Sequence, residues 1–64
     1  MADLFDVWAV NIESGVMRLM AASKDGANAA AIVKMAVMRR GVDEEIFVEA
    51  PAGEFSEGDI WESA

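Results

Sequence analysis

The chain has 64 residues, 55% of them hydrophobic, and contains neither histidine nor cysteine. This length predicts one small domain, residues 1–64, and the missing residue types exclude disulfides, thiolate or imidazole metal sites and Ser–His–Asp catalysis. The formal net charge is −7, and the last 24 residues hold eight acids and no base. Such a surface repels nucleic acid and anionic membranes, and it attracts proteins with basic grooves.

The first two expected elements are strands joined by a tight turn. Aromatic and β-branched residues dominate residues 4–12, which favours a strand. Its alternation is imperfect, because large apolar residues occupy both faces, so the sequence does not decide which face is buried. Residues 13–15 end in a glycine and predict a turn, and residues 16–22 predict the returning strand.

A helix is predicted over residues 27–40, which are rich in alanine and methionine and contain no proline. Ser23 or Asp25 is expected to cap its first turn, and Gly41 is expected to end it. The two arginines of the last turn favour the helix dipole. The residues expected to form its inner stripe are Ala29, Ile32, Val33, Ala36 and Val37.

Residues 46–50 predict a third strand, which Pro51 and the following residues end. A short final strand or an ordered tail is expected around Ile60 and Trp61. The order β-β-α-β, with or without a fourth strand, predicts an α+β fold in which one α-helix packs on a small antiparallel sheet.

Catalysis, metal binding and contact with nucleic acid are all disfavoured. A domain this small leaves little room for a substrate cleft between two carboxylates. The consecutive acids Asp43, Glu44 and Glu45 do not match the spaced ligands of a calcium loop, and on a strand they alternate between faces. The net charge opposes nucleic acid, and the few basic residues are expected to cap and solubilise the helix. The sequence therefore predicts no enzyme activity, no cofactor and no metal site.

The acidic C-terminal part favours a surface that imitates DNA. Side chains two apart on a strand share a face at a spacing of about 6.7 Å, so strand carboxylates approach the charge density of a phosphate track. A surface that serves solubility alone usually mixes charges of both signs. The residues expected to contact the partner are Asp43, Glu44, Glu45, Phe47, Glu49, Glu54, Glu57, Asp59, Trp61 and Glu62. Phe47, Phe55 or Trp61 is expected to supply an apolar anchor, and Trp61 is equally compatible with the core.

Residues 30–41, Ala-Ala-Ile-Val-Lys-Met-Ala-Val-Met-Arg-Arg-Gly, precede an acidic strand. With the size of the chain, this pattern resembles the small acidic phage-borne anti-CRISPR proteins, more narrowly those directed at the type I-C surveillance complex. The resemblance covers most of the chain, and no catalytic motif anchors it. It implies a non-enzymatic inhibitor that binds a Cas subunit, blocks target DNA and needs no cofactor.

The expected partner is therefore a protein with a basic DNA-binding groove, and neither nucleic acid nor a membrane. We expect a monomer or homodimer that acts in the cytoplasm of the bacterial host, since no signal peptide or membrane span is visible. The alternative is a small homodimerising phage or bacterial adaptor protein unrelated to DNA.

Overall fold

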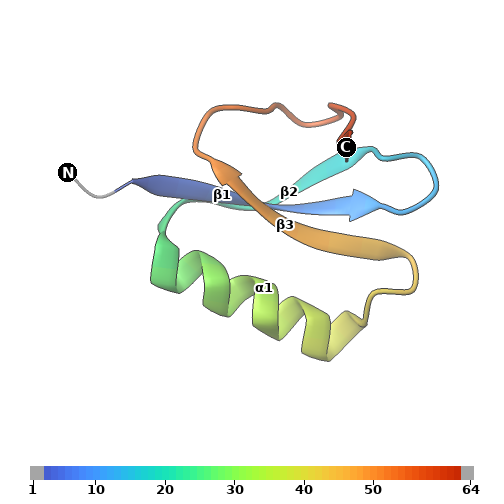
Figure 1. Ribbon diagram of the computed structural model, residues 1–64, viewed down its shortest axis with the longest axis horizontal. Helices are drawn as coiled ribbons and strands as arrows, with labels where there is room; N and C mark the ends of the chain where they lie inside the picture. Colours follow the sequence, from blue (N-terminus) through green and yellow to red (C-terminus); the bar gives the residue numbers. More distant parts are fainter. Residues whose placement is uncertain (1–2, 63–64) are drawn as a thin grey trace.

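A computed structural model describes residues 3–62 and confirms the predicted α+β fold. The elements follow one another as β1 (Leu4–Asn11), β2 (Met17–Asp25), α1 (Gly26–Arg40) and β3 (Glu45–Pro51). The strands form one antiparallel sheet in the order β2-β1-β3, so β1 lies at its centre. In Figure 1, α1 runs along one face of this sheet, and the segment after β3 folds back over the other.

Both faces of β1 are buried, which explains the imperfect alternation of its sequence. Ala9 is 0% exposed and packs with Ala36 of α1. Trp8 is 1% exposed and faces the opposite side, where Phe55 and Trp61 of the C-terminal segment cover it. The molecule therefore has three layers: α1, the sheet and the C-terminal segment.

The ends of α1 follow the predicted local chemistry. Asp25 is the N-cap, and its carboxylate accepts a hydrogen bond from the amide of Asn28 at 2.9 Å. At the other end Gly41 has φ 70, and its amide donates to the carbonyl oxygen of Val37 at 2.9 Å. These short-range contacts explain why the sequence placed this helix to within one residue.

The inner stripe of α1 is narrower than predicted. Ala29 and Ala36 are buried and Ile32 and Val33 are half-buried, but Val37 is 40% exposed, so its place in the stripe was wrong. Each helical residue is rotated about 100° from the one before. Because only three strands lie above the helix, a side chain one position beyond Ala36 points past the sheet.

β2 continues to Asp25, beyond the predicted end of the strand at residue 22. Two irregularities in its pairing with β1, on either side of Val7, insert extra residues and bend the strand. At the bend Ser23 has φ 55, and its amide donates to Oδ1 of Asp6 at 3.0 Å. A non-glycine residue in the left-handed region carries no sequence signal, so local patterns missed this extension.

The C-terminal segment, residues 52–62, is an ordered tail without a fourth named strand. A single β-bridge joins Val16 to Ile60, and the amide of Trp61 donates to the carbonyl oxygen of Gly15 at 2.8 Å. Gly15 has φ 76, and a Cβ there would lie 3.2 Å from the carbonyl oxygen of Trp61. The close approach of the tail therefore requires glycine at this turn.

Candidate protein-interaction surface

The carboxylates beyond Gly41 are the first candidates for a binding surface. Seven are exposed and Glu45 is half-buried. Within residues 3–62, Glu45 is also the only one of the eight that forms an ion pair. The eight are Asp43, Glu44, Glu45, Glu49, Glu54, Glu57, Asp59 and Glu62. Seven negative charges on this part of the molecule thus form no ion pair with another residue in the range 3–62.

Glu45 joins the sheet to the end of α1. Its Oε1 lies 3.2 Å from Nη2 of Arg18 on β2 and 3.7 Å from Nη1 of Arg40 on α1. Arg18 reaches it across β1, where its paired residue is the small Ala9. Both arginine side chains are about half exposed, so each pair contributes at most about 1 kcal/mol to stability. Glu45 thus has a structural role, and its charge is partly neutralised within the chain.

Two further carboxylates fasten the C-terminal segment. Oε1 of Glu57 accepts a hydrogen bond from the amide of Leu19 at 3.1 Å, and Oδ2 of Asp59 accepts one from the amide of Ser56 at 2.8 Å. Five acids remain without an ion pair or a side-chain hydrogen bond to any residue in the range 3–62. These free carboxylates are Asp43, Glu44, Glu49, Glu54 and Glu62.

The aromatic residues expected to anchor a partner lie in or against the core. Phe47 is 9% exposed and packs between β1 and α1. Phe55 and Trp61 are half-buried, with ring centroids 5.5 Å apart, and the centroid of Phe55 lies 6.5 Å from that of Trp8. Phe47 therefore offers no exposed ring, and the other two offer only the outer part of a stacked cluster.

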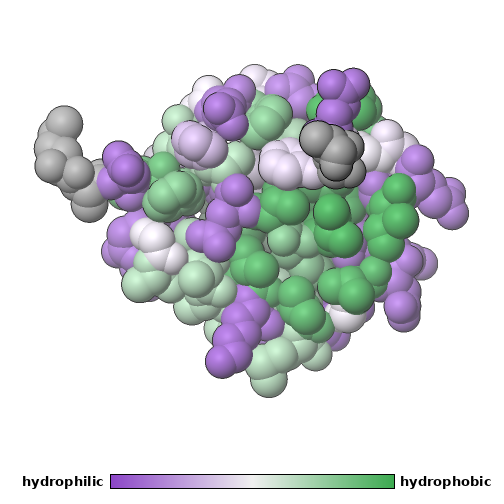
Figure 2. All heavy atoms as spheres, in the orientation of Figure 1, coloured by the Kyte–Doolittle hydropathy of each residue, from purple (hydrophilic) through white to green (hydrophobic). Residues whose placement is uncertain are grey.

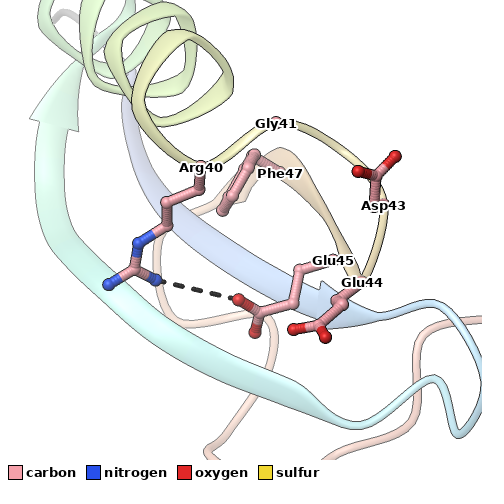
Figure 3. Close-up of a pocket in the computed structure, with 6 residues that line it drawn as sticks. All are labelled: Arg40, Gly41, Asp43, Glu44, Glu45 and Phe47. Atoms are coloured by element: carbon pink, nitrogen blue, oxygen red, sulfur yellow. Dashed lines mark ion pairs between the residues drawn. The ribbon is translucent and has the colours of Figure 1, made fainter.

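A groove of about 460 Å³ lies between the end of α1 and the start of β3. Figure 3 shows the carboxylates of Glu44 and Glu45 lying near each other, with Arg40 approaching Glu45, while Asp43 points away. The remaining lining residues are Gly41 and Phe47. No group of three carboxylates among residues 3–62 is arranged to hold a metal ion. One arginine against three acids leaves the groove negatively charged, so it favours a cationic group.

Exposed aliphatic side chains were missed as candidates by the sequence, and four of them lie on α1, on β3 and in the loops next to the end of β1 and the start of β3. Ile12 is 51% exposed, Val42 49%, Val37 40% and Ile46 37%. The amide of Ile12 donates to the carbonyl oxygen of Glu44 at 2.9 Å, which holds the end of β1 against the start of β3. Figure 2 shows strongly hydrophobic residues gathered over this part of the face. The only sequence signal was that Ile12, Val42 and Ile46 each lie next to an acid.

Comparisons with known proteins identify no relative. No family model, no curated protein and no solved structure matches the chain. In the described part of the chain, no helix has the length and apolar character needed to cross a membrane.

Proposed function

We propose that this protein is a non-enzymatic inhibitor that binds a basic nucleic-acid-binding surface of a CRISPR surveillance complex and blocks target DNA. The resemblance to type I-C anti-CRISPR proteins supports this choice of partner, and the proposed site of action is the bacterial cytoplasm. The free carboxylates take the place of DNA phosphates, and arginines of the target form charge-assisted hydrogen bonds with them.

One observation carries this proposal: seven of the eight carboxylates beyond Gly41 have no ion pair within residues 3–62. Unpaired charges of one sign steer association with a surface of the opposite sign. The exposed aliphatic residues beside them supply apolar contact area, which charge alone does not provide. Glu45, Glu57 and Asp59 already form contacts within the fold. Of the acids predicted to contact the partner, we therefore assign only the free carboxylates to it.

Charge reversal tests this assignment. Asp43→Lys and Glu54→Lys each change the net charge by two units at a free carboxylate, without removing an ion pair or a side-chain hydrogen bond within residues 3–62. A like charge placed in a basic groove costs several kcal/mol, so each reversal is expected to weaken inhibition at least about tenfold. The assay measures the fraction of labelled target DNA bound to a purified type I-C surveillance complex as the protein is added.

Ala27→Lys combined with Ala31→Lys is the matched control, because it changes the net charge equally on the exposed part of α1. We expect this control to inhibit like the parent. Equal inhibition by the parent and both reversals would show that the acidic surface does not compete with DNA. If the control weakened inhibition as much as the reversals do, inhibition would depend on the net charge of the protein and not on the position of the carboxylates.

The alternative, a homodimerising adaptor, is favoured by one observation: β3 is an edge strand of the sheet. Sedimentation equilibrium at micromolar concentration distinguishes the two functions. A stable dimer that leaves DNA binding by the surveillance complex unchanged would favour the adaptor.

A further inference from the structure

The two edges of the sheet differ in how their backbone is covered. Along β2, the amide of Met17 donates to the carbonyl oxygen of Asp59 at 2.8 Å, and the amide of Gly58 donates to that of Met17 at 3.0 Å. The side chain of Glu57 accepts from Leu19 on the same edge. The C-terminal segment thus occupies the outer edge of β2 near its start.

The opposite edge, on β3, is open. The amide of Ile12 donates to Glu44 at 2.9 Å and that of Ala52 donates to Leu4 at 3.0 Å, which fixes the phase of the β1–β3 ladder. Hydrogen-bonded positions alternate along an antiparallel pair. The positions that bond to β1 are therefore Ile46, Val48 and Ala50. The positions whose N–H and C=O groups point to the open edge are Glu45, Phe47 and Glu49.

No other segment among residues 3–62 forms a hydrogen bond with the backbone N–H or C=O groups of these three positions; Arg18 contacts only the side chain of Glu45. β3 also crosses in front of the other two strands in Figure 1, so the view in Figure 2 looks onto this edge. An edge strand with unpaired backbone groups is a template on which another strand can pair.

The side chains along β3 specify what such a strand should contain. Glu45 and Glu49 lie on the face of the strand turned to α1, beside the acidic groove, whereas Ile46 and Val48 lie on the other face. Ile46 is 37% exposed and the residue Glu49 is exposed. Cross-strand neighbours stabilise a sheet when their charges are opposite or both are apolar. An added strand should therefore alternate cationic and apolar residues.

A second copy of this chain does not meet that requirement. If two β3 strands paired antiparallel about Phe47, Glu45 of each copy would lie opposite Glu49 of the other. Like charges directly opposite each other destabilise a sheet, and each chain carries a net charge of −7. Charge complementarity thus selects a basic partner.

We infer that the open edge of β3 binds an extended segment of another protein, in which cationic and apolar residues alternate, as an additional antiparallel strand. The cationic residues of this segment lie opposite Glu45 and Glu49. The aliphatic stem of a lysine opposite Glu45 packs over the groove, and its ammonium group reaches the carboxylate of Glu44. The inference does not rest on the proposed competition with DNA, because a peptide segment and a DNA-binding groove are different ligands.

Titration with a synthetic peptide tests the inference on the protein alone. The probe contains Lys-Val-Thr-Val-Lys between short glycine–serine flanks, and the same peptide with glutamate in place of lysine is the control. Binding is measured by calorimetry and by amide hydrogen exchange. We expect the lysine peptide to bind and to slow exchange at Glu45, Phe47 and Glu49 at least about tenfold. The glutamate peptide is expected not to bind.

Two variants at position 49 distinguish the contribution of the backbone N–H group to peptide binding from that of the side-chain charge. Glu49→Pro removes an outward N–H, which an edge strand tolerates, and is expected to abolish binding. Glu49→Gln keeps that N–H and removes only the charge, so severalfold weaker binding is expected. If the proline variant does not fold, as judged by circular dichroism, a synthetic chain with an N-methyl group on the Phe47 amide replaces it.

Three outcomes would overturn the inference. The first is no binding of the lysine peptide, which would mean that the acids only protect the edge from pairing. The second is undiminished binding after loss of the outward N–H. The third is slowed exchange at these amides without peptide, in a dimer. None of them bears on the DNA competition, since the titration contains neither DNA nor a CRISPR complex.

Discussion

Asp6 holds together three parts of the molecule, although it is a buried acid in a chain rich in exposed ones. It is 7% exposed, and its two carboxylate oxygens accept hydrogen bonds from the amides of Ser23 and Gly53, each at 3.0 Å. Both donors have positive φ, at the bend of β2 and in the turn after β3. One carboxylate therefore fixes two unusual backbone turns against the central strand.

Replacing Asp6 with alanine should lower the free energy of unfolding by about 3 kcal/mol. Two charge-assisted hydrogen bonds are lost, and two backbone N–H groups lose their acceptor. The total stability of a chain this short is only about 3–10 kcal/mol, so the substitution should remove about a third or more of it. Urea denaturation followed by circular dichroism measures the effect. Asp3→Ala, at an exposed position, is the control and should change stability by less than about 0.5 kcal/mol. An equal effect of both substitutions would contradict the role of Asp6.

The chemistry of individual acids was only partly predictable from the sequence. The acidic character of the last 24 residues is visible in the composition. The partners of Glu45 and Glu57 are not, because Arg18 lies 27 positions from the first and Leu19 lies 38 positions from the second. Such contacts depend on how the strands pair, which no local pattern encodes. The sequence therefore treated eight acids as equivalent, and the structure divides them into fastening acids and free carboxylates.

At the scale of elements, α1 approaches the sheet closely because small residues form its inner stripe. Ala29 and Ala36 of α1 are 0% and 6% exposed, and Ala9 of β1, with which Ala36 packs, is 0% exposed. Their size leaves the larger apolar residues of the helix at its flanks, and Met35 and Met38 are 54% and 76% exposed. These two methionines therefore lie outside the core.

Ala36 is buried and packs with Ala9 and Phe47, so we expect a larger residue at position 36 to crowd these neighbours. Ala36→Leu should lower the free energy of unfolding by about 1–3 kcal/mol, because the added atoms force α1 away from Phe47 and Ala9. Ala31→Leu makes the same change at an exposed position of the same helix and should be nearly neutral. Thermal denaturation compares the two variants. A stabilising effect at position 36 would reveal unfilled space beneath the helix.

The elements differed in how well their sequences predicted them. Gly41 and Asp25 define α1 through contacts within a few residues, so the helix was predicted almost to its ends. The C-terminal segment is ordered by distant contacts, such as Trp61 with Gly15, and its position over the second face of the sheet could not be predicted. That position also explains why Trp8 and Ala9 are both buried on opposite faces of one strand.

For the whole molecule, the main electrostatic feature is the separation of charge between elements. All five basic residues belong to β2 and α1, whereas the eight acids beyond Gly41 belong to β3 and the loops on either side of it. Two arginines are drawn toward Glu45, and the free carboxylates remain available. A molecule with this distribution should approach a basic partner with β3 and the C-terminal segment leading, and with α1 behind.

Competition with target DNA tests the central claim most directly. The apparent Kd of a type I-C surveillance complex for labelled target DNA is measured at several fixed concentrations of the protein. If the free carboxylates occupy the DNA-binding surface, the apparent Kd should rise in proportion to the protein concentration, while the amount of DNA bound at saturation stays constant. A fall in the saturating amount with an unchanged Kd, or no effect at any concentration, would contradict the account.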